Sequence, residues 1–317
     1  MKIALIDVDG HNFPNLPLMK ISEYHKRHGD CVEWIDPFDK YDIAYKSKVF
    51  SFTPDYPHPI NANIIESGGS GYAIQTINGV EFYNKNLDIN LPPEVENIMP
   101  DYSLYKLQNT AIGFLTRGCP RACSFCHVKD KEGLKSIKVA DLNQFWNGQK
   151  NLILCDPNFF ACIEWENLLI DIIKSNAIVD FNQGIDIRLL NKEKIKLLNM
   201  TKMNDIHFAF DTMNNCDIVL EKLELYKKYG KIKKVTVFVL VNYNTTFEQD
   251  LWRIDQLKKL KFNPFVMIYN KANAAVKYKQ LAGWVNNKII FKSCENFADY
   301  NRYTKKTLHQ NQLVFSF

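Results

Sequence analysis

Residues 110–133 read TAIGFLTRGCPRACSFCHVKDKEG and carry three cysteines, Cys119, Cys123 and Cys126. The apolar run before the cysteines predicts a short buried strand, and a glycine and a proline beside the first cysteine end that strand in a loop. Such a loop can bring three thiolates to one point. The C-x3-C-x2-C spacing at a strand end therefore predicts a metal or cluster site.

Three sulfur ligands are one fewer than a closed zinc site or an ordinary four-cysteine cluster takes from the protein. One coordination position is therefore left open to a ligand from outside the chain. A zinc site completed by His127 is the alternative, although a histidine directly after Cys126 has to fold back sharply to reach the same ion. Disulfides are not expected, because the sequence shows no secretory signal.

The chain of 317 residues is long enough for two domains, and its hydrophobic share of 46% is ordinary for a globular protein. No run approaches the ~18 apolar residues of a membrane span, so we expect a soluble, cytoplasmic protein without membrane contact. The net charge of +5 comes mostly from scattered lysines, which are typical of a solvated surface. A mildly positive balance is also compatible with a nucleic-acid substrate.

Residues 1–105 predict a small α/β domain. Its expected elements are a strand at 2–9, a helix at 16–29 and further strands at 31–36, 41–51 and 61–69. This order predicts a parallel, doubly wound sheet of the Rossmann or flavodoxin type. Prolines between 92 and 100 mark the segment that connects this domain to the next.

The cysteine loop resembles that of the radical SAM superfamily, in which three cysteines hold a [4Fe-4S] cluster. In that family the fourth iron binds the amino and carboxylate groups of S-adenosylmethionine (SAM). Phe125, directly before the last cysteine, also fits the family pattern. The segment PDYSLY at 100–105, together with the cysteine loop, is similar to a radical SAM group found in bacteria and phages. This resemblance implies the cofactors but no substrate.

Beyond the loop, strands and helices alternate as the resemblance requires. Six strands are expected, at 111–115, 151–155, 178–184, 206–211, 234–241 and 264–270. The resemblance therefore implies that residues 106–275 form a partial (β/α)6 TIM barrel. We expect residues 276–317 to form an extension that covers the barrel, with a base-stacking surface for RNA or DNA as the alternative.

In such folds the chemistry lies at the carboxyl ends of the strands. The residues expected to bind the cofactors are Phe125, Asp156, Asn158, Gly184, Asp186, Arg188 and Asp211. Asp156 and Asn158 stand where the commonest relatives place a Gly-Gly-Glu motif, and their oxygens can accept hydrogen bonds from the amino group of SAM. A helix cap is the alternative role for Asp156.

The other positions also have two interpretations each. Arg188 can bind the SAM carboxylate with two hydrogen bonds, or it can pair structurally with Asp186. Asp211 can hold ribose hydroxyls or substrate, or it can make a buried structural hydrogen bond. The sequence assigns no catalytic residue.

Residues 1–105 also resemble the cobalamin-binding-like domain that precedes many radical SAM cores. Asp9, Gly10 and His11 begin the D-x-H-x-x-G signature of cobalamin proteins, but Pro14 occupies the final glycine position. Ligation of cobalt by His11 is therefore not expected, while cobalamin-dependent methyl transfer stays open.

The resemblance implies an enzyme that reductively cleaves SAM to a 5'-deoxyadenosyl radical. The electron would come from an external reductant of the flavodoxin or ferredoxin type. The alternative from another functional class is a non-catalytic, metal-stabilised module that binds nucleic acid.

Overall fold

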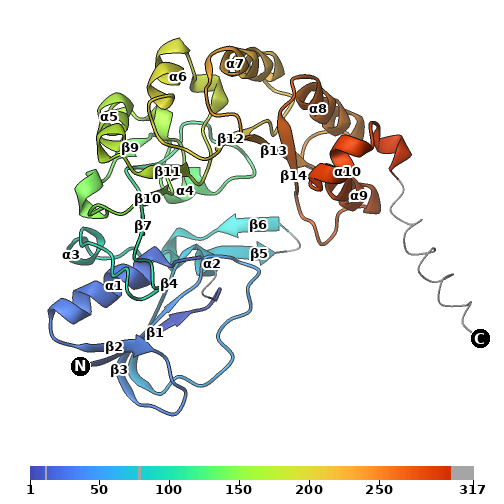
Figure 1. The fold of residues 1–317 in the computed structure, drawn as a ribbon. Coiled ribbons are helices and arrows are strands. Elements are labelled where there is room, and N and C mark those ends of the chain that lie inside the picture. The colour runs from blue at the N-terminus through green and yellow to red at the C-terminus, as the bar shows by residue number, and fades with distance from the viewer. Residues whose placement is uncertain (11–12, 78–79, 301–317) are drawn as a thin grey trace, which may run out of the picture. The chain divides into compact units, whose positions relative to one another are not determined.

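The computed structural model describes residues 1–10, 13–77 and 80–300 (Figure 1). The chain divides into two compact units. Unit 1 comprises Met1–Gly184 and Leu197–Asn204, and unit 2 comprises Ile185–Lys196 and Asp205–Phe317. Among the described residues, unit 1 contains two parallel sheets and unit 2 contains one. His11 of the cobalamin-like signature lies outside the described residues.

Unit 1 begins with a four-stranded parallel sheet in the order β2-β1-β3-β4. Its elements are β1 (Lys2–Asp7), α1 (Leu16–Arg27), β2 (Cys31–Trp34), β3 (Tyr41–Ser47) and β4 (Ala62–Gly68). The side chain of Asn15 accepts the amide of Leu18 and so caps the start of α1. Leu18 forms one buried cluster with Ile3 and Leu5 of β1, which fixes the helix on the sheet.

A hairpin and a second parallel sheet complete unit 1. The hairpin follows α2 (Ser70–Ala73) and consists of β5 (Ile74–Ile77) and β6 (Val80–Tyr83). The second sheet has the order β11-β10-β7, with β7 (Thr110–Gly113), β10 (Asn151–Leu154) and β11 (Ile178–Phe181). The remaining elements are α3 (Pro93–Glu96), β8 (Thr116–Arg117), α4 (Val128–Lys131), β9 (Ile137–Lys138) and α5 (Trp165–Ser175).

Unit 2 is built on a three-stranded parallel sheet in the order β12-β13-β14. Its strands are β12 (Ile206–Ala209), β13 (Val235–Val241) and β14 (Asn263–Ile268). The helices are α7 (Cys216–Tyr229), α8 (Phe247–Lys259), α9 (Val276–Val285) and α10 (Lys288–Ser293), while α6 (Lys192–Leu198) runs across the division between the units. A capping box of Thr246 and Gln249 begins α8.

The sequence therefore predicted the mixed α/β class and the parallel sheets correctly. All six strands expected in residues 106–275 form, but they pair as two sheets of three, and the described residues contain no closed barrel. The edge of β11 that faces away from β10 makes its own backbone contact. Ile178 on that edge bridges to Lys202, and Val179 donates its amide to the Lys202 carbonyl at 2.8 Å.

Three aromatic residues after β14 belong to the interior of unit 2. Trp284 is fully buried, and Tyr278 and Phe291 are less than a tenth exposed. Their rings are therefore packing groups and do not offer a base-stacking surface. Residues 301–317, the rest of the expected extension, lie outside the described residues. In the part of the chain that is described, no helix is both long and apolar enough to cross a membrane.

Candidate functional site

The cysteine loop leaves the sheet at a glycine that no other residue can replace without strain. Gly118 has φ +88°, in the left-handed region, and a Cβ built on it would lie 2.1 Å from the Lys135 carbonyl oxygen. The next amide, that of Cys119, donates to the Gly133 carbonyl at 3.1 Å. These close approaches join the two ends of the loop, so that residues 119–133 form a closed segment beside β8 and β9.

The side chains of the three cysteines are half-buried. Cys126 donates its amide to the Cys123 carbonyl at 3.0 Å, which closes a turn directly before α4. Among the described residues, no group of three or more His, Cys, Asp or Glu side chains is arranged around one metal ion. A [4Fe-4S] cubane takes each thiolate on a different iron, so its three thiolates do not have to surround a single ion. Three thiols within eight residues fit such a group.

Asn158 contacts the first cysteine from the end of β10. Its side-chain amide donates to the Cys119 sulfur at 3.5 Å, and its backbone carbonyl accepts from the Ser136 hydroxyl at 2.9 Å. Asn158 is only 3% exposed, so this geometry is fixed by packing. Amide donors to ligand sulfurs are one means by which proteins set the potential of iron–sulfur clusters.

Asp156 holds the base of the loop. One carboxylate oxygen accepts from the Thr116 amide and, at 2.7 Å, from the Thr116 hydroxyl, while the other accepts from the Leu115 amide at 3.2 Å. The side chain thus ties the end of β10 to the residues that follow β7. It does not cap α5, whose N-cap residue is Glu164. Burial raises the pKa of Asp156 to about 6, against the opposing effect of these hydrogen bonds.

His127 contacts a carboxylate on the hairpin of unit 1. Its Nε2 lies 3.3 Å from a carboxylate oxygen of Glu81 on β6. The side chain that the zinc alternative requires as fourth ligand is therefore engaged with an acidic residue. Phe125, the other predicted position within the loop, is half-buried.

Charged side chains form a chain of ion pairs at the start of the loop. Glu132 accepts the Gly118 amide at 3.1 Å with one oxygen and pairs with Arg117 at 3.1 Å with the other. Arg117 also lies 3.7 Å from Glu96, which pairs with Lys20 of α1 at 2.9 Å. Arg117 therefore belongs to a chain of ion pairs that includes Glu132, Glu96 and Lys20.

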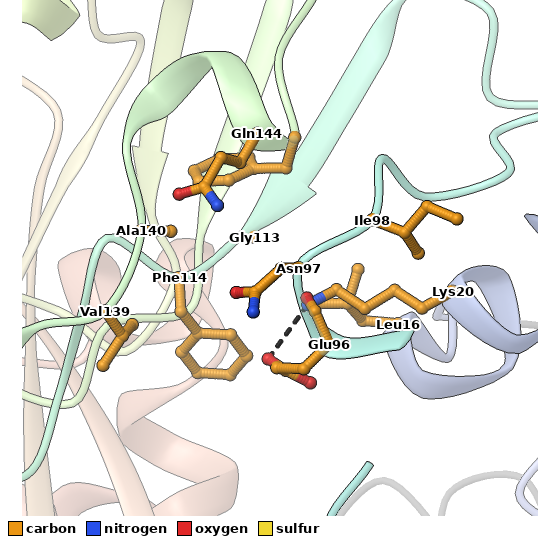
Figure 2. A pocket seen from close by; sticks show the side chains of 11 residues that line it. Leu16, Lys20, Glu96, Asn97, Ile98, Gly113, Phe114, Val139, Ala140 and Gln144 are labelled. Carbon is orange, nitrogen blue, oxygen red and sulfur yellow. Dashed lines mark hydrogen bonds and ion pairs between the residues drawn. The ribbon is translucent and has the colours of Figure 1, made fainter. Parts of the chain in front are cut away.

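Figure 2 shows the pocket beside this chain of charges, with Lys20 of α1 directed at Glu96. Burial lowers the pKa of Lys20, while the charge of Glu96 opposes the shift. The pocket volume is about 30 Å³, which is the share of one water molecule in the liquid. This pocket is too small for SAM and is part of the support of the loop.

The remaining predicted residues lie at the end of unit 1 and within unit 2. Gly184, with φ +78°, is the last residue of the first segment of unit 1. In unit 2, Arg188 donates to both carboxylate oxygens of Asp186, at 2.7 and 3.2 Å. Asp211 accepts the Leu240 amide at 3.0 Å. Burial raises the pKa of Asp211, while this amide and the charges of Arg253 and Arg188 oppose the shift.

The predicted residues thus fall into two groups. Unit 1 brings Asn158 to Cys119 and Asp156 to the base of the loop, and unit 2 brings Arg188 to Asp186 and within electrostatic range of Asp211. No family model and no curated protein matches this chain. The function is therefore inferred from the residues of the chain alone.

Sequence reasoning missed the buried ion pair of unit 2. Arg253 and Asp250 of α8 are both fully buried and pair at 2.5 Å. Arg253 also donates to the carbonyls of Phe210 and Leu240, which follow β12 and lie in β13. The sequence does contain a sign of this pair. Asp250 and Arg253 are three residues apart on the helix face that carries Ile254 and Leu257, and a charged residue on a buried face needs a partner.

Proposed function

We propose that this protein is a radical SAM enzyme in which Cys119, Cys123 and Cys126 hold one [4Fe-4S] cluster. The observation that carries the proposal is the hydrogen bond from the Asn158 amide to the Cys119 sulfur. It joins a C-x3-C-x2-C loop after β7 to the carboxyl end of the neighbouring parallel strand β10. The carboxyl ends of parallel strands are where α/β folds bind their ligands.

A bound cluster with one open iron would supply the electron that cleaves SAM to methionine and a 5'-deoxyadenosyl radical. The three thiolates would bind the cluster, and the Asn158 N–H would offset part of the negative charge on one of them. Asp156 would keep the loop in place through its three hydrogen bonds to Leu115 and Thr116. An external reductant of the flavodoxin or ferredoxin type would deliver the electron.

The proposal includes a finer assignment of the fold. The two three-stranded parallel sheets, with helices in their connections, are what a partial (β/α)6 barrel needs. The order β2-β1-β3-β4 agrees with the first four strands of a flavodoxin-like sheet. This strand order supports the assignment of the first domain as cobalamin-binding-like, and the assignment does not require that cobalamin binds.

Anaerobic reconstitution with iron and sulfide tests the proposal. We expect about four irons per chain, an electron paramagnetic resonance signal that changes on addition of SAM, and 5'-deoxyadenosine after reduction. Replacing Cys119, Cys123 and Cys126 together by alanine should abolish all three. The matched control is the double variant Cys31→Ala, Cys294→Ala, which removes thiols outside the loop and should retain them.

Two other results would contradict the proposal or extend it. A colourless protein that holds one zinc ion would support the metal-stabilised nucleic-acid-binding module instead. Cobalamin added to the reconstituted protein, followed by its visible absorption, separates a methyltransferase from an enzyme that uses SAM alone.

A further inference from the structure

A second pocket lies in unit 2, where the carboxyl end of α8, the start of β14 and α10 come together (Figure 1). Its volume is about 280 Å³, near the lower limit of ~300 Å³ for small-molecule sites. Four lysines and no acidic residue line it, beside apolar side chains that include Phe262 and Val285. We call it the lysine pocket, after Lys258, Lys261, Lys288 and Lys292.

Lys258 is held in place at this pocket. Its ammonium group donates to the Glu295 carbonyl at 2.5 Å. It also lies 5.4 Å from the ring centre of Trp284 and 5.0 Å from that of Phe291. Contacts with ring faces favour a cation without neutralising it. The positive charge of Lys258 is therefore ordered and remains available to an anion.

The other three lysines add charge that the described chain does not balance. Lys261 follows α8 with a left-handed φ of 61°. Lys288 and Lys292 are four residues apart on α10, so their charges lie on the same helix face and repel. Among residues 1–10, 13–77 and 80–300, none of the four pocket lysines makes an ion pair with a carboxylate.

The acidic residues that follow or precede the pocket lysines most closely in the sequence are Asp255 and Glu295, and within the described chain neither forms an ion pair with a pocket lysine. Asp255, one turn before Lys258 on α8, is within electrostatic range of it without forming an ion pair. The segment 301–317 contains no aspartate or glutamate. A cluster of like charges around a hollow lowers its free energy when an anion enters. The lysine pocket is thus prepared for a ligand that brings negative charge.

We propose that the lysine pocket binds the phosphate of a nucleotide. A phosphate group has the charge and the acceptor oxygens that several ammonium groups can share. The apolar walls are suited to the sugar and base, and the volume limits the occupant to about one nucleotide. That nucleotide can be free or can be one residue of a nucleic-acid strand. The proposal does not depend on the cluster or on SAM.

Isothermal titration of the full chain tests the pocket with adenosine 5'-monophosphate, adenosine and a 5'-phosphorylated single-stranded oligonucleotide. We expect the monophosphate to bind with an affinity that falls as salt is added, and adenosine not to bind. Tighter binding of the oligonucleotide would identify a strand as the source of the nucleotide, and equal binding would identify the free nucleotide. Binding of adenosine as tight as that of its monophosphate would overturn the proposal.

The triple variant Lys261→Gln, Lys288→Gln, Lys292→Gln should weaken binding of the monophosphate about 30-fold or more. It leaves Lys258 intact, because Lys258 packs on Trp284 and supports the fold. The control is Lys227→Gln, Lys228→Gln, Lys271→Gln, which removes the same charge from exposed positions of unit 2 outside the pocket. Unchanged binding by the first variant, or equal weakening by both, would contradict a defined phosphate site.

Discussion

Each unit buries an aspartate beside the end of a parallel strand, but the two carboxylates have different kinds of hydrogen-bond partner. Asp250 of unit 2 pairs with the fully buried Arg253 and accepts the Asn242 amide at 3.2 Å. Asp156 of unit 1 accepts hydrogen bonds from the neutral groups of Leu115 and Thr116. The first arrangement stabilises the interior of unit 2, whereas the second holds the loop that carries the three cysteines.

The two buried aspartates are therefore sensitive to different changes. A buried carboxylate without a cation is destabilised by burial, and the pKa of Asp156 rises to about 6 for this reason. A buried ion pair depends instead on both partners being present. The predictions that follow separate these two cases.

The largest expected change in the free energy of unfolding follows from replacing Arg253. Arg253→Met leaves Asp250 buried without its cation and should lower the free energy of unfolding by about 3–5 kcal/mol. Urea denaturation followed by the fluorescence of the adjacent Trp252 measures this change. The double variant Asp250→Asn, Arg253→Met removes both charges and should be more stable than Arg253→Met alone. If the double variant is the less stable of the two, the pair is not the source of the effect.

The next largest effect is a pH dependence of the folding stability that is caused by Asp156. Its pKa is about 6 in the folded chain and near the ordinary value of 3.8 in the unfolded chain. Between these values the folded chain binds more protons, so stability should fall as the pH rises from about 4 to about 6. The difference corresponds to about 3 kcal/mol.

Asp156→Asn removes this titration. In urea denaturation of the protein without cofactors, the unmodified chain should lose about 3 kcal/mol relative to the variant between pH 4 and pH 7. The variant should also be less stable at pH 4, because its NH2 group faces the Leu115 amide and one hydrogen bond is lost. Parallel pH profiles for the two proteins would mean that Asp156 is not buried as described.

A smaller effect concerns the Asn158 hydrogen bond and follows from the proposed cluster. Asn158→Leu keeps the size of the side chain but removes the N–H donor to the Cys119 sulfur. Because that donor stabilises the more negative, reduced cluster, the reduction potential should become more negative. A redox titration at equal iron content measures the shift. Ser136→Ala, which removes only the partner of the Asn158 carbonyl, should leave the potential unchanged.

The smallest effect is expected for Glu132, which contacts Gly118 and Arg117 at the start of the loop. Glu132→Gln weakens the pair with the part-exposed Arg117, and such pairs contribute about 0–1 kcal/mol. The loss in the free energy of unfolding should therefore stay below about 1 kcal/mol. Added salt should reduce the difference between the two proteins, since a partly exposed pair is screened. A loss as large as that of Arg253→Met would place Glu132 among the buried determinants of the fold.

The sequence was most informative where a local pattern determines the structure. Apolar runs predicted the strands of the three parallel sheets, and the asparagine at 15 stands where a helix cap is needed. The division of the six later strands into two sheets was not predictable, because the choice of strand partners is decided by contacts of the kind that joins Ile178 to Lys202. Such a contact between distant residues leaves no periodic signal in the sequence.

The candidate site shows the same limit. The cysteine spacing and the positions after β10 could be found from the sequence, but the roles of Asp156 and Asn158 could not. A residue type indicates which hydrogen bonds are available, whereas packing decides which donor is nearest. For Asp186 and Arg188, two residues apart, the structural pairing that the sequence left open is the one present.

Gly118 has a consequence for how this protein can diverge. With a carbonyl oxygen 2.1 Å from where a methyl group would begin, the position rejects even alanine. Homologues that keep the loop in this conformation must keep the glycine, however far the rest of their sequences drift. Substitution there would therefore mark a lineage that has abandoned the loop geometry, even if all three thiols were retained.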